Sequence, residues 1–127
     1  MKEIFESFKK SLKRLEEILQ KEKTVEYRDS AIQRFEFTIE LAWKTVQKFL
    51  REQEIICRSP KECLQEAFKY GLLKDDPRWI KAFEDRNLTV HTYNEKLAEE
   101  IYERLNDYCP LFDDLKKEIE RNINKSE

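Results

Sequence analysis

Residues 31–50, AIQRFEFTIELAWKTVQKFL, decide the fold of this chain. Apolar residues recur in it at every third or fourth position, which is the spacing of one face of an α-helix. That stripe consists of Ile32, Phe35, Ile39, Trp43, Val46 and Leu50. Phe37, Leu41 and Phe49 fall outside the stripe, so the helix is apolar on more than one face. Either it is the central helix of a bundle, or its extra face contacts another chain.

Helix signals continue on both sides of this stretch. The spacing of apolar residues predicts helices over roughly residues 2–22, 27–53 and 95–122. A short helix is expected from Ser59-Pro60 to Gly71, and another begins at Asp76-Pro77. One glycine and three prolines in 127 residues also suit long helices better than a sheet. The sequence therefore predicts an all-α fold, an antiparallel four-helix bundle with an additional short helix, in a single domain of residues 1–127.

The charge balance limits the kinds of ligand. The 25 Lys and Arg residues nearly cancel the 27 Asp and Glu residues, so the chain lacks the basic surface of a general nucleic-acid binder. Any contact with RNA must then be local. No apolar run approaches the roughly 18 residues of a membrane span, and the Met-Lys-Glu start lacks the apolar segment of a signal peptide. We expect a cytoplasmic protein.

The cysteines are few and irregularly spaced. Cys57, Cys63 and Cys109 are odd in number and form no Cys-x-x-Cys pair, so we expect reduced and mostly buried thiols. With one histidine in the chain, a zinc site is not expected, and neither is any other metal or cofactor.

The segment Arg86-Asn87-Leu88-Thr89-Val90-His91-Thr92-Tyr93 holds the single histidine. Histidine is the only residue type whose unperturbed pKa lies near neutrality, and arginine binds phosphate through a planar set of donors. The β-branched residues around His91 predict that the helix ends there, and Asn94 is a candidate N-cap for the next one. His91 and Tyr93 are thus expected at a helix end, facing solvent or a ligand. The pairing of residue types favours phosphodiester chemistry.

The motif Arg-x-x-x-x-His-x-Tyr, with Asn directly after the Arg, resembles the signature of the HEPN superfamily. In particular, it resembles that of the HepT-type toxins of HEPN/MNT modules, which are also called nucleotidyltransferase substrate-binding proteins. Further segments resemble that subgroup in the same order: Arg34-Phe35-Glu36-Phe37, Glu40-Leu41-Ala42-Trp43-Lys44, Ser59-Pro60, Glu66-Ala67-Phe68, Glu84-Asp85 and Glu99-Glu100-Ile101-Tyr102. The resemblance covers most of the chain.

This resemblance implies a metal-independent endoribonuclease that acts as the toxin of a toxin–antitoxin pair. His91 would transfer a proton, Arg86 would stabilise charge on the phosphoryl oxygens, and Asn87 would position the phosphate. Tyr93 would accept AMP from a minimal nucleotidyltransferase, the antitoxin, which would silence the nuclease. The resemblance also implies a homodimer in which two motifs share one cleft.

Other interpretations stay open for each residue. Arg86 can form an ion pair with Glu84, Asp85 or a neighbouring helix, and Asn87 can pair with His91 as a structural cap. Glu36 and Glu40, four residues apart, are best interpreted as exposed helix charge. For the whole protein, the alternative is a non-catalytic subunit that presents a substrate or nucleotide to a nucleotidyltransferase.

Overall fold

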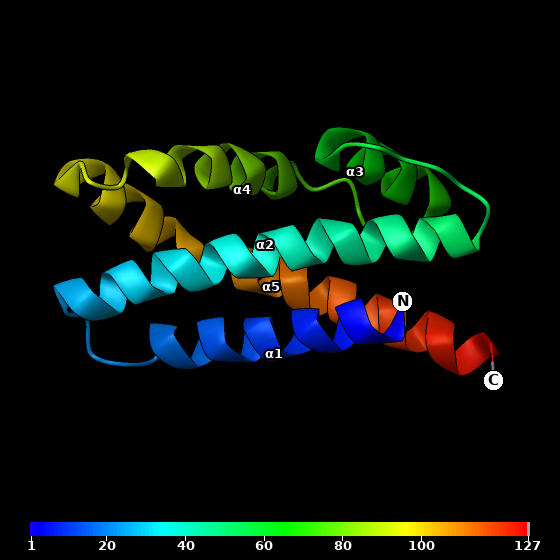
Figure 1. The fold of residues 1–127 in the computed structure, drawn as a ribbon, viewed down its shortest axis with the longest axis horizontal. Coiled ribbons are helices and arrows are strands. Elements are labelled where there is room, and N and C mark those ends of the chain that lie inside the picture. Colours follow the sequence, from blue (N-terminus) through cyan, green and yellow to red (C-terminus); the bar gives the residue numbers. More distant parts are fainter. Residues whose placement is uncertain (127) are drawn as a thin grey trace.

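The computed structural model describes residues 1–126, which form helices and connecting turns without a strand. The long helices are α1 (Lys2–Leu19), α2 (Val25–Glu52) and α5 (Glu95–Ser126). The shorter ones are α3 (Pro60–Tyr70) and α4 (Pro77–Leu88), and a 3₁₀ turn, η1 (Thr89–His91), follows α4. Helix α1 runs opposite to α2 and α5, α4 returns the chain between α2 and α5, and both termini lie at the same end of the molecule (Figure 1). The predicted all-α fold is confirmed.

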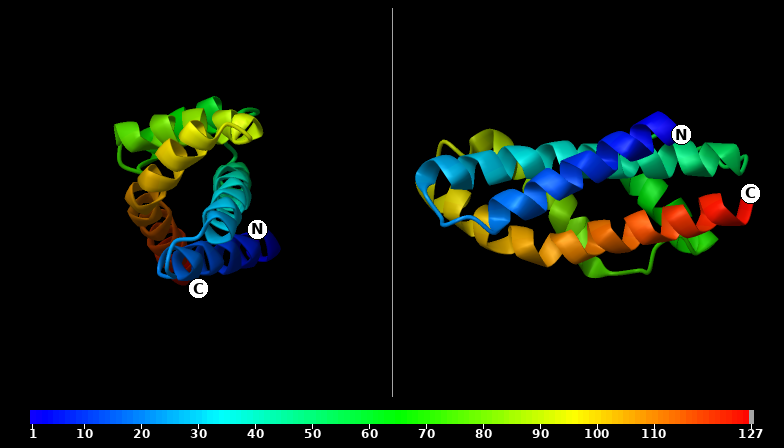
Figure 2. Two further views of the ribbon diagram at one scale, coloured as in Figure 1. Left: turned by 90° about the vertical axis from the view of Figure 1, so that its left-hand side faces the viewer. Right: turned by 90° about the horizontal axis from the view of Figure 1, so that it is seen from below.

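Helix α2 lies at the centre of the arrangement and contacts α1, α3, α4 and α5. Figure 1 shows α1 on one side of α2 and the pair α3 and α4 on the other. Figure 2 shows the same arrangement from the end and from below. The two short helices α3 and α4, of 11 and 12 residues, take the place of a fourth long helix on that side of α2. No helix within residues 1–126 is long and apolar enough to cross a membrane.

The two apolar faces of α2 are largely covered within this one chain. Ile32, Phe35 and Ile39 are fully or almost fully buried, as the stripe predicts. Phe49, which lies off the stripe, is buried by α3, where its ring meets that of Tyr70 edge-on at 5.5 Å between centroids. The central position of α2 therefore accounts for most of its extra apolar surface. Phe37 stays exposed.

The helices begin and end at the capping residues that the sequence predicts. The Ser59 hydroxyl accepts a hydrogen bond from the Glu62 amide at 3.2 Å and caps α3, with proline at the first helical position. Gly71 ends α3 with φ at +89°, a left-handed conformation that glycine adopts at little cost. Asp76 caps α4 by accepting from the Arg78 amide at 2.9 Å. These predicted caps are confirmed.

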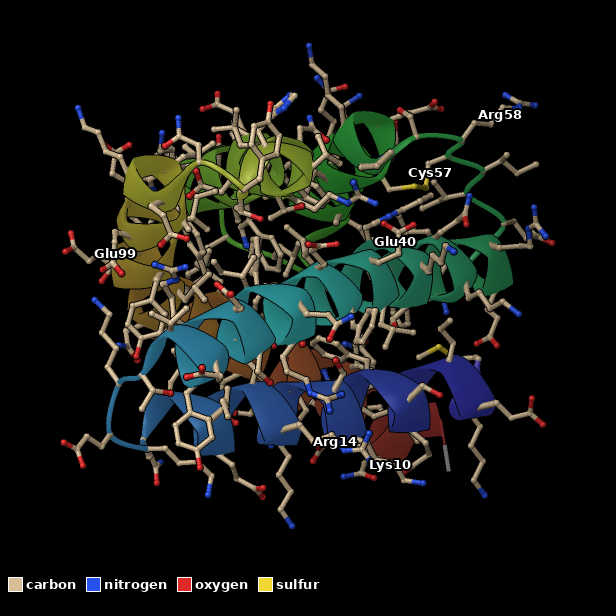
Figure 3. The ribbon with its side chains drawn as sticks, turned by 60° about the vertical axis from the view of Figure 1, so that its left-hand side comes forward. Lys10, Arg14, Glu40, Cys57, Arg58 and Glu99 are labelled. Carbon is tan, nitrogen blue, oxygen red and sulfur yellow. A yellow bond between two sulfur atoms is a disulfide. The ribbon has the colours of Figure 1, made fainter. Side chains whose placement is uncertain are left out.

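The prediction that all three cysteines are reduced thiols is wrong for two of them. Cys57 and Cys63 form a disulfide with a Cα–Cα distance of 5.1 Å, visible beside Cys57 in Figure 3. After α2 the chain reverses at Glu54, whose φ is +64°, and this turn carries Cys57 back against the first turns of α3. Cys109 is a free, partly buried thiol, and burial raises its pKa to about 12.

Candidate functional site

Helix α4 is fixed to α5 by a buried carboxylate directly before the motif. Asp85 is 0% exposed and accepts hydrogen bonds from Arg104 Nε at 2.8 Å and Nη2 at 2.7 Å, and from the Tyr108 hydroxyl. The hydrogen bonds to Asp85 raise the pKa of Arg104. Burial first, and then the bond to Asp85, raises the pKa of Tyr108. A buried charge that has all its hydrogen-bond partners is costly to disturb. This cluster therefore fixes the position of α4, and with it the point from which the side chain of the next residue, Arg86, projects.

Threonine hydroxyls end α4 just before His91. Thr89 Oγ1 donates to the Arg86 carbonyl at 2.7 Å, and Thr92 Oγ1 donates to the Thr89 carbonyl at 2.8 Å. Such side-chain bonds compete with the continuing helix, and here the chain tightens into η1. The predicted helix end near His91 is confirmed.

The next helix begins directly after the motif. Asn94 Oδ1 accepts a hydrogen bond from the Leu97 amide at 3.1 Å, and the Asn94 carbonyl accepts from the Ala98 amide at 3.0 Å. Asn94 therefore caps α5, as predicted. Nearby, the buried guanidinium of Arg28 on α2 donates to Glu95 at 2.7 Å and to Glu99 at 2.9 Å, which holds the first turns of α5 against α2. Glu99 marks this end of α5 in Figure 3. Both ends of the short turn 89–94 are thus anchored.

Arg86 meets a carboxylate of α2. Its Nη2 lies 3.5 Å from Glu40 Oε2, and the two side chains are 37% and 35% exposed. The ion pair with a neighbouring helix, which the sequence left open, is therefore present. Sequence reasoning treated Glu40 as simple exposed charge and missed it as a neighbour of the motif. Its one available signal was the resemblance of the segment Glu40–Lys44 to the same subgroup as the motif.

His91 and Tyr93 both lie at the surface. Their rings meet nearly edge-on, with centroids 6.1 Å apart and planes at 79°, and Tyr93 is 82% exposed. Asn87 is also exposed, and its side chain forms no hydrogen bond with His91 or with any other residue in the range 1–126. The structure thus brings His91 and Tyr93 together and Arg86 and Glu40 together. In this single chain it shows no hydrogen bond or ion pair between Arg86 and His91 among the described residues.

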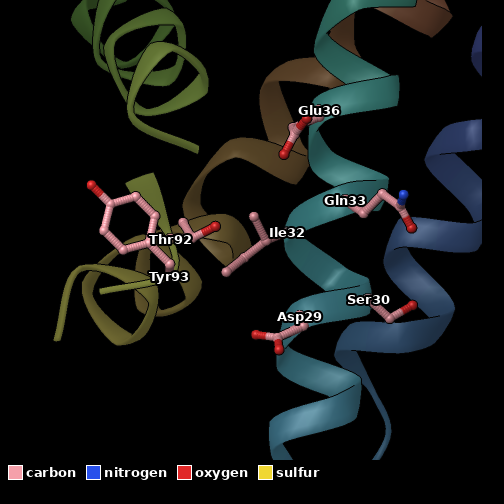
Figure 4. A pocket seen from close by; sticks show the side chains of 7 residues that line it. All are labelled: Asp29, Ser30, Ile32, Gln33, Glu36, Thr92 and Tyr93. Atoms are coloured by element: carbon pink, nitrogen blue, oxygen red, sulfur yellow. The ribbon is translucent and has the colours of Figure 1, made fainter. Parts of the chain in front are cut away.

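A pocket of about 620 Å³ lies between the motif turn and α2. Thr92 and Tyr93 line it on one side, and Asp29, Ile32 and Glu36 are among the α2 residues on the other (Figure 4). The Tyr93 hydroxyl points away from α2 (Figure 4). The α2 wall carries two carboxylates and no cation. It therefore suits water or a cationic group better than the phosphates of RNA.

The described residues hold no group of three His, Cys, Asp or Glu side chains placed to bind a metal ion. The chemistry that the motif offers is instead that of an exposed imidazole, an exposed phenol and a guanidinium. An imidazole can take or give a proton, a phenol can accept a transferred group, and a guanidinium binds phosphate oxygens.

Comparison with known proteins gives matches over most of the chain. The family "Nucleotidyltransferase substrate binding protein like" matches residues 3–121. A probable ribonuclease HepT from Haemophilus influenzae is 34% identical over 83 residues, which are 61% of this chain and 57% of that protein. The chain thus matches a little over half the length of this curated relative.

Two solved structures share the fold. One is of a Thermus thermophilus protein, with 43% identity and a TM-score of 0.79 over 85% of this chain and 94% of that one. The other, from Haemophilus influenzae, revealed the fold of a substrate binding domain of a nucleotidyltransferase; it is 23% identical, with a TM-score of 0.81 over 91% of this chain and 98% of that one. The resemblance found in the sequence is confirmed, and this chain belongs to the family of nucleotidyltransferase substrate binding protein-like proteins.

Proposed function

We propose that this protein is a HepT-type toxin, a metal-independent endoribonuclease that is silenced by AMP transfer to Tyr93. The observation that carries the proposal is the turn 89–94, which presents His91 and Tyr93 in edge contact at the surface, directly after the helix that carries Arg86. A relative at 34% identity is itself a probable ribonuclease. An imidazole and a guanidinium on one exposed segment are the groups that phosphodiester cleavage needs.

The proposed reaction is an internal transfer at phosphorus. The ribose 2′-oxygen gives its proton to a base and bonds to the adjacent phosphorus, and the bond from phosphorus to the 5′-oxygen breaks. The leaving 5′-oxygen takes a proton from an acid, so the products are a 2′,3′-cyclic phosphate and a 5′-hydroxyl. His91 serves as base or acid, Arg86 stabilises the phosphoryl oxygens, and Asn87 positions the phosphate. The exposed pair of Arg86 with Glu40 contributes little stability, so phosphate can replace the carboxylate.

The reaction benefits from both an acid and a base, and each chain has one histidine. We therefore propose that the active form is a homodimer in which two copies of the motif face one cleft. The exposed positions of His91 and Asn87 support this arrangement, because neither side chain is enclosed by its own chain.

Regulation is proposed to act on Tyr93. Its hydroxyl would attack the α-phosphorus of ATP in a partner nucleotidyltransferase, forming a tyrosyl–AMP bond and releasing pyrophosphate. The 82% exposure of Tyr93 leaves the hydroxyl accessible to another protein. The added phosphate and nucleoside would lie within a residue or two of His91 and repel RNA from the cleft.

A second candidate function is a non-catalytic subunit that presents substrate to a nucleotidyltransferase. The family's description favours it. It requires no chemistry from His91, so the two candidates differ in what the purified protein does to RNA.

The deciding experiment treats single-stranded RNA with the purified protein, with and without EDTA. We expect cleavage products with cyclic phosphate ends in both conditions. After incubation with the cognate nucleotidyltransferase, ATP and Mg²⁺, the protein should gain mass in AMP-sized steps on Tyr93 and lose activity. Tyr93→Phe should keep its activity and its mass. An intact RNA under all conditions, or an AMP adduct elsewhere with activity unaffected, would favour the substrate-presenting subunit.

A further inference from the structure

A second groove, of about 560 Å³, runs between α3 and α4 and reaches Asn87 of the motif. Its walls are mainly apolar: Leu64 and Phe68 come from α3, and Ile80 and Phe83 come from α4. This volume lies in the range of small-ligand pockets, which are mostly apolar with a few polar groups. The proposed function makes no use of this groove beyond Asn87.

The walls offer ring and aliphatic surface to a ligand. Ile80 is 56% exposed, and Phe68 and Phe83 are only partly buried against the core. Phe68 and Phe83 make no ring contact with each other within the described residues, although both line this groove. The parts of both rings that line the groove can contact a flat apolar group.

Two of the polar groups in the groove are side-chain carboxamides. The carboxamides of Gln65 and Asn87 both line it, and neither has a hydrogen-bond partner among residues 1–126. A carboxamide donates and accepts at once, which is the pattern that the edges of nucleobases match.

Lys61 and the N-terminus of α3 supply positive charge at the α3 end of the groove, where the first turn of α3 also carries Glu62. Lys61, in the first turn of α3, lines the groove and forms no ion pair within the described part of the chain. The N-terminus of α3 adds its own partial positive charge. Glu84 also lines the groove, and Lys81 lies 3.9 Å from its carboxylate and offsets part of its charge. The apolar walls are thus bordered by groups that attract phosphate.

We propose that this groove binds a nucleobase, stacked against the rings of Phe68 and Phe83 and read at its edge by Gln65 and Asn87. Single-stranded RNA is commonly recognised in this way, through stacking on aromatic side chains and hydrogen bonds to base edges. The proposal rests on the proposed function for its main source of the base, an RNA nucleotide beside the scissile phosphate, because Asn87 directly follows Arg86. A free adenine nucleotide has the same chemistry and is the second source.

The test measures binding without cleavage. Fluorescence anisotropy compares a fully 2′-O-methylated oligonucleotide, which cannot react, with an oligonucleotide of the same length that lacks its bases. The variants are Ile80→Asp, which places a charge in the groove, and Ile56→Asp, at a control isoleucine outside the groove whose exposure, 58%, is close to the 56% of Ile80. Both positions are exposed, so circular dichroism should show unchanged helix content.

We expect the wild-type protein and Ile56→Asp to bind the oligonucleotide with bases about tenfold more tightly than the one without bases. Ile80→Asp should bind the two oligonucleotides with equal affinity. Gln65→Ala should alter the order of preference among adenine, cytosine and uracil oligonucleotides. A separate titration with AMP tests whether the base comes from a free nucleotide. It does so if AMP binds to the wild type and to Ile56→Asp but not to Ile80→Asp.

Two results would each count against the proposal: equal binding of both oligonucleotides to the wild type, or the same ratio of the two affinities in Ile80→Asp and Ile56→Asp. The proposal is overturned if either result is found and AMP binding is also absent or independent of Ile80. The proposed nuclease activity is tested separately, by the cleavage assay. A protein that leaves RNA intact but binds AMP or RNA bases through Ile80 would retain this groove as a nucleobase site.

Discussion

Asp85 and Arg86 are consecutive residues of α4, yet their ion pairs are opposite in character. Asp85 is fully buried and receives three hydrogen bonds, from two nitrogens of Arg104 and from the Tyr108 hydroxyl. Arg86 and Glu40 are each more than a third exposed and approach only to 3.5 Å. In the pair of Asp85 with Arg104 the carboxylate is fully buried, and the Arg104 side chain is 30% exposed. The pair of Arg86 with Glu40 contributes little stability, because both side chains are partly exposed, so another anion could replace the carboxylate.

This difference assigns separate tasks to the two faces of α4. The inner face holds the helix against α5 through Asp85, and the outer face carries Arg86 of the motif. A site that exchanges partners needs such a support, because a small displacement of its groups costs much of their chemical effect. Each face can be tested by a substitution that should leave the other face unaffected.

The largest effect is expected on the exposed face. His91→Ala should lower the rate of RNA cleavage by roughly 10²–10⁴-fold, the usual contribution of one proton-transfer group. The urea midpoint should not change, because His91 is exposed and forms no hydrogen bond through its side chain within residues 1–126. Val90→Ala, at the exposed residue before it, is the control and should cleave RNA as the wild type does. Equal rates for the two variants would remove His91 from the mechanism.

On the buried face, Asp85→Ala should lower the free energy of unfolding by about 3 kcal/mol, because the buried Tyr108 hydroxyl and the partly exposed Arg104 both lose their partner. Urea denaturation followed by circular dichroism measures this change. Glu40→Ala is the matched control on the exposed pair and should cost less than about 1 kcal/mol. If the two variants were equally stable, the contrast between the faces would not hold.

The sequence predicted the helices and their caps better than it predicted the neighbours of the motif. Helix ends depend on residues a few positions apart, so Ser59, Gly71 and Asn94 could be assigned from local chemistry alone. The partner of Arg86 is 46 positions away on α2, and the same helix also carries Glu36, one turn earlier. Only the packing of α4 on α2 determines which of the two carboxylates lies near the guanidinium.

The disulfide shows the same limit. Cys57 and Cys63 are six positions apart, which fits no common short motif, and their approach depends on the reversal of the chain at Glu54. A glutamate in the left-handed conformation gives no signal in the sequence, because that conformation is uncommon for residues other than glycine and asparagine. Likewise the sequence offered Asp85 as a possible partner of Arg86, whereas in the structure Asp85 accepts hydrogen bonds from Arg104 and Tyr108 of α5.

A pH titration sharpens the contrast on the buried side. The pKa of Tyr108 is raised by burial and by Asp85, so the folded protein keeps this phenol protonated where the unfolded chain, with a pKa near 10, loses the proton. The stabilisation is complete below about pH 10 and is lost as the pH rises above it, by up to about 1.4 kcal/mol per pH unit.

The Tyr108→Phe variant isolates this effect. The difference in unfolding free energy between wild type and variant should shrink between about pH 10 and pH 11, as measured by urea denaturation at each pH. The other tyrosines and the lysines are common to both proteins, so their titration cancels. A difference that stays constant over this range would mean that Tyr108 ionises as readily in the folded state as in the unfolded chain.

The smallest effect is expected from Glu40→Gln, and its sign is informative. If the carboxylate only occupies the guanidinium until phosphate replaces it, its removal should increase RNA affinity by a few-fold, since an exposed pair contributes less than about 1 kcal/mol. Lys44→Gln is a control, because Lys44 pairs with the same Glu40 at 3.5 Å but does not belong to the motif, and its loss should not strengthen RNA binding. Anisotropy with an uncleavable RNA oligonucleotide measures both variants at fixed ionic strength, because phosphate contacts depend strongly on salt.

A large loss of affinity in Glu40→Gln would instead show that the carboxylate holds Arg86 in its binding position. The exposed pair would then resemble the buried one, as a fixed support for the site instead of an exchangeable partner.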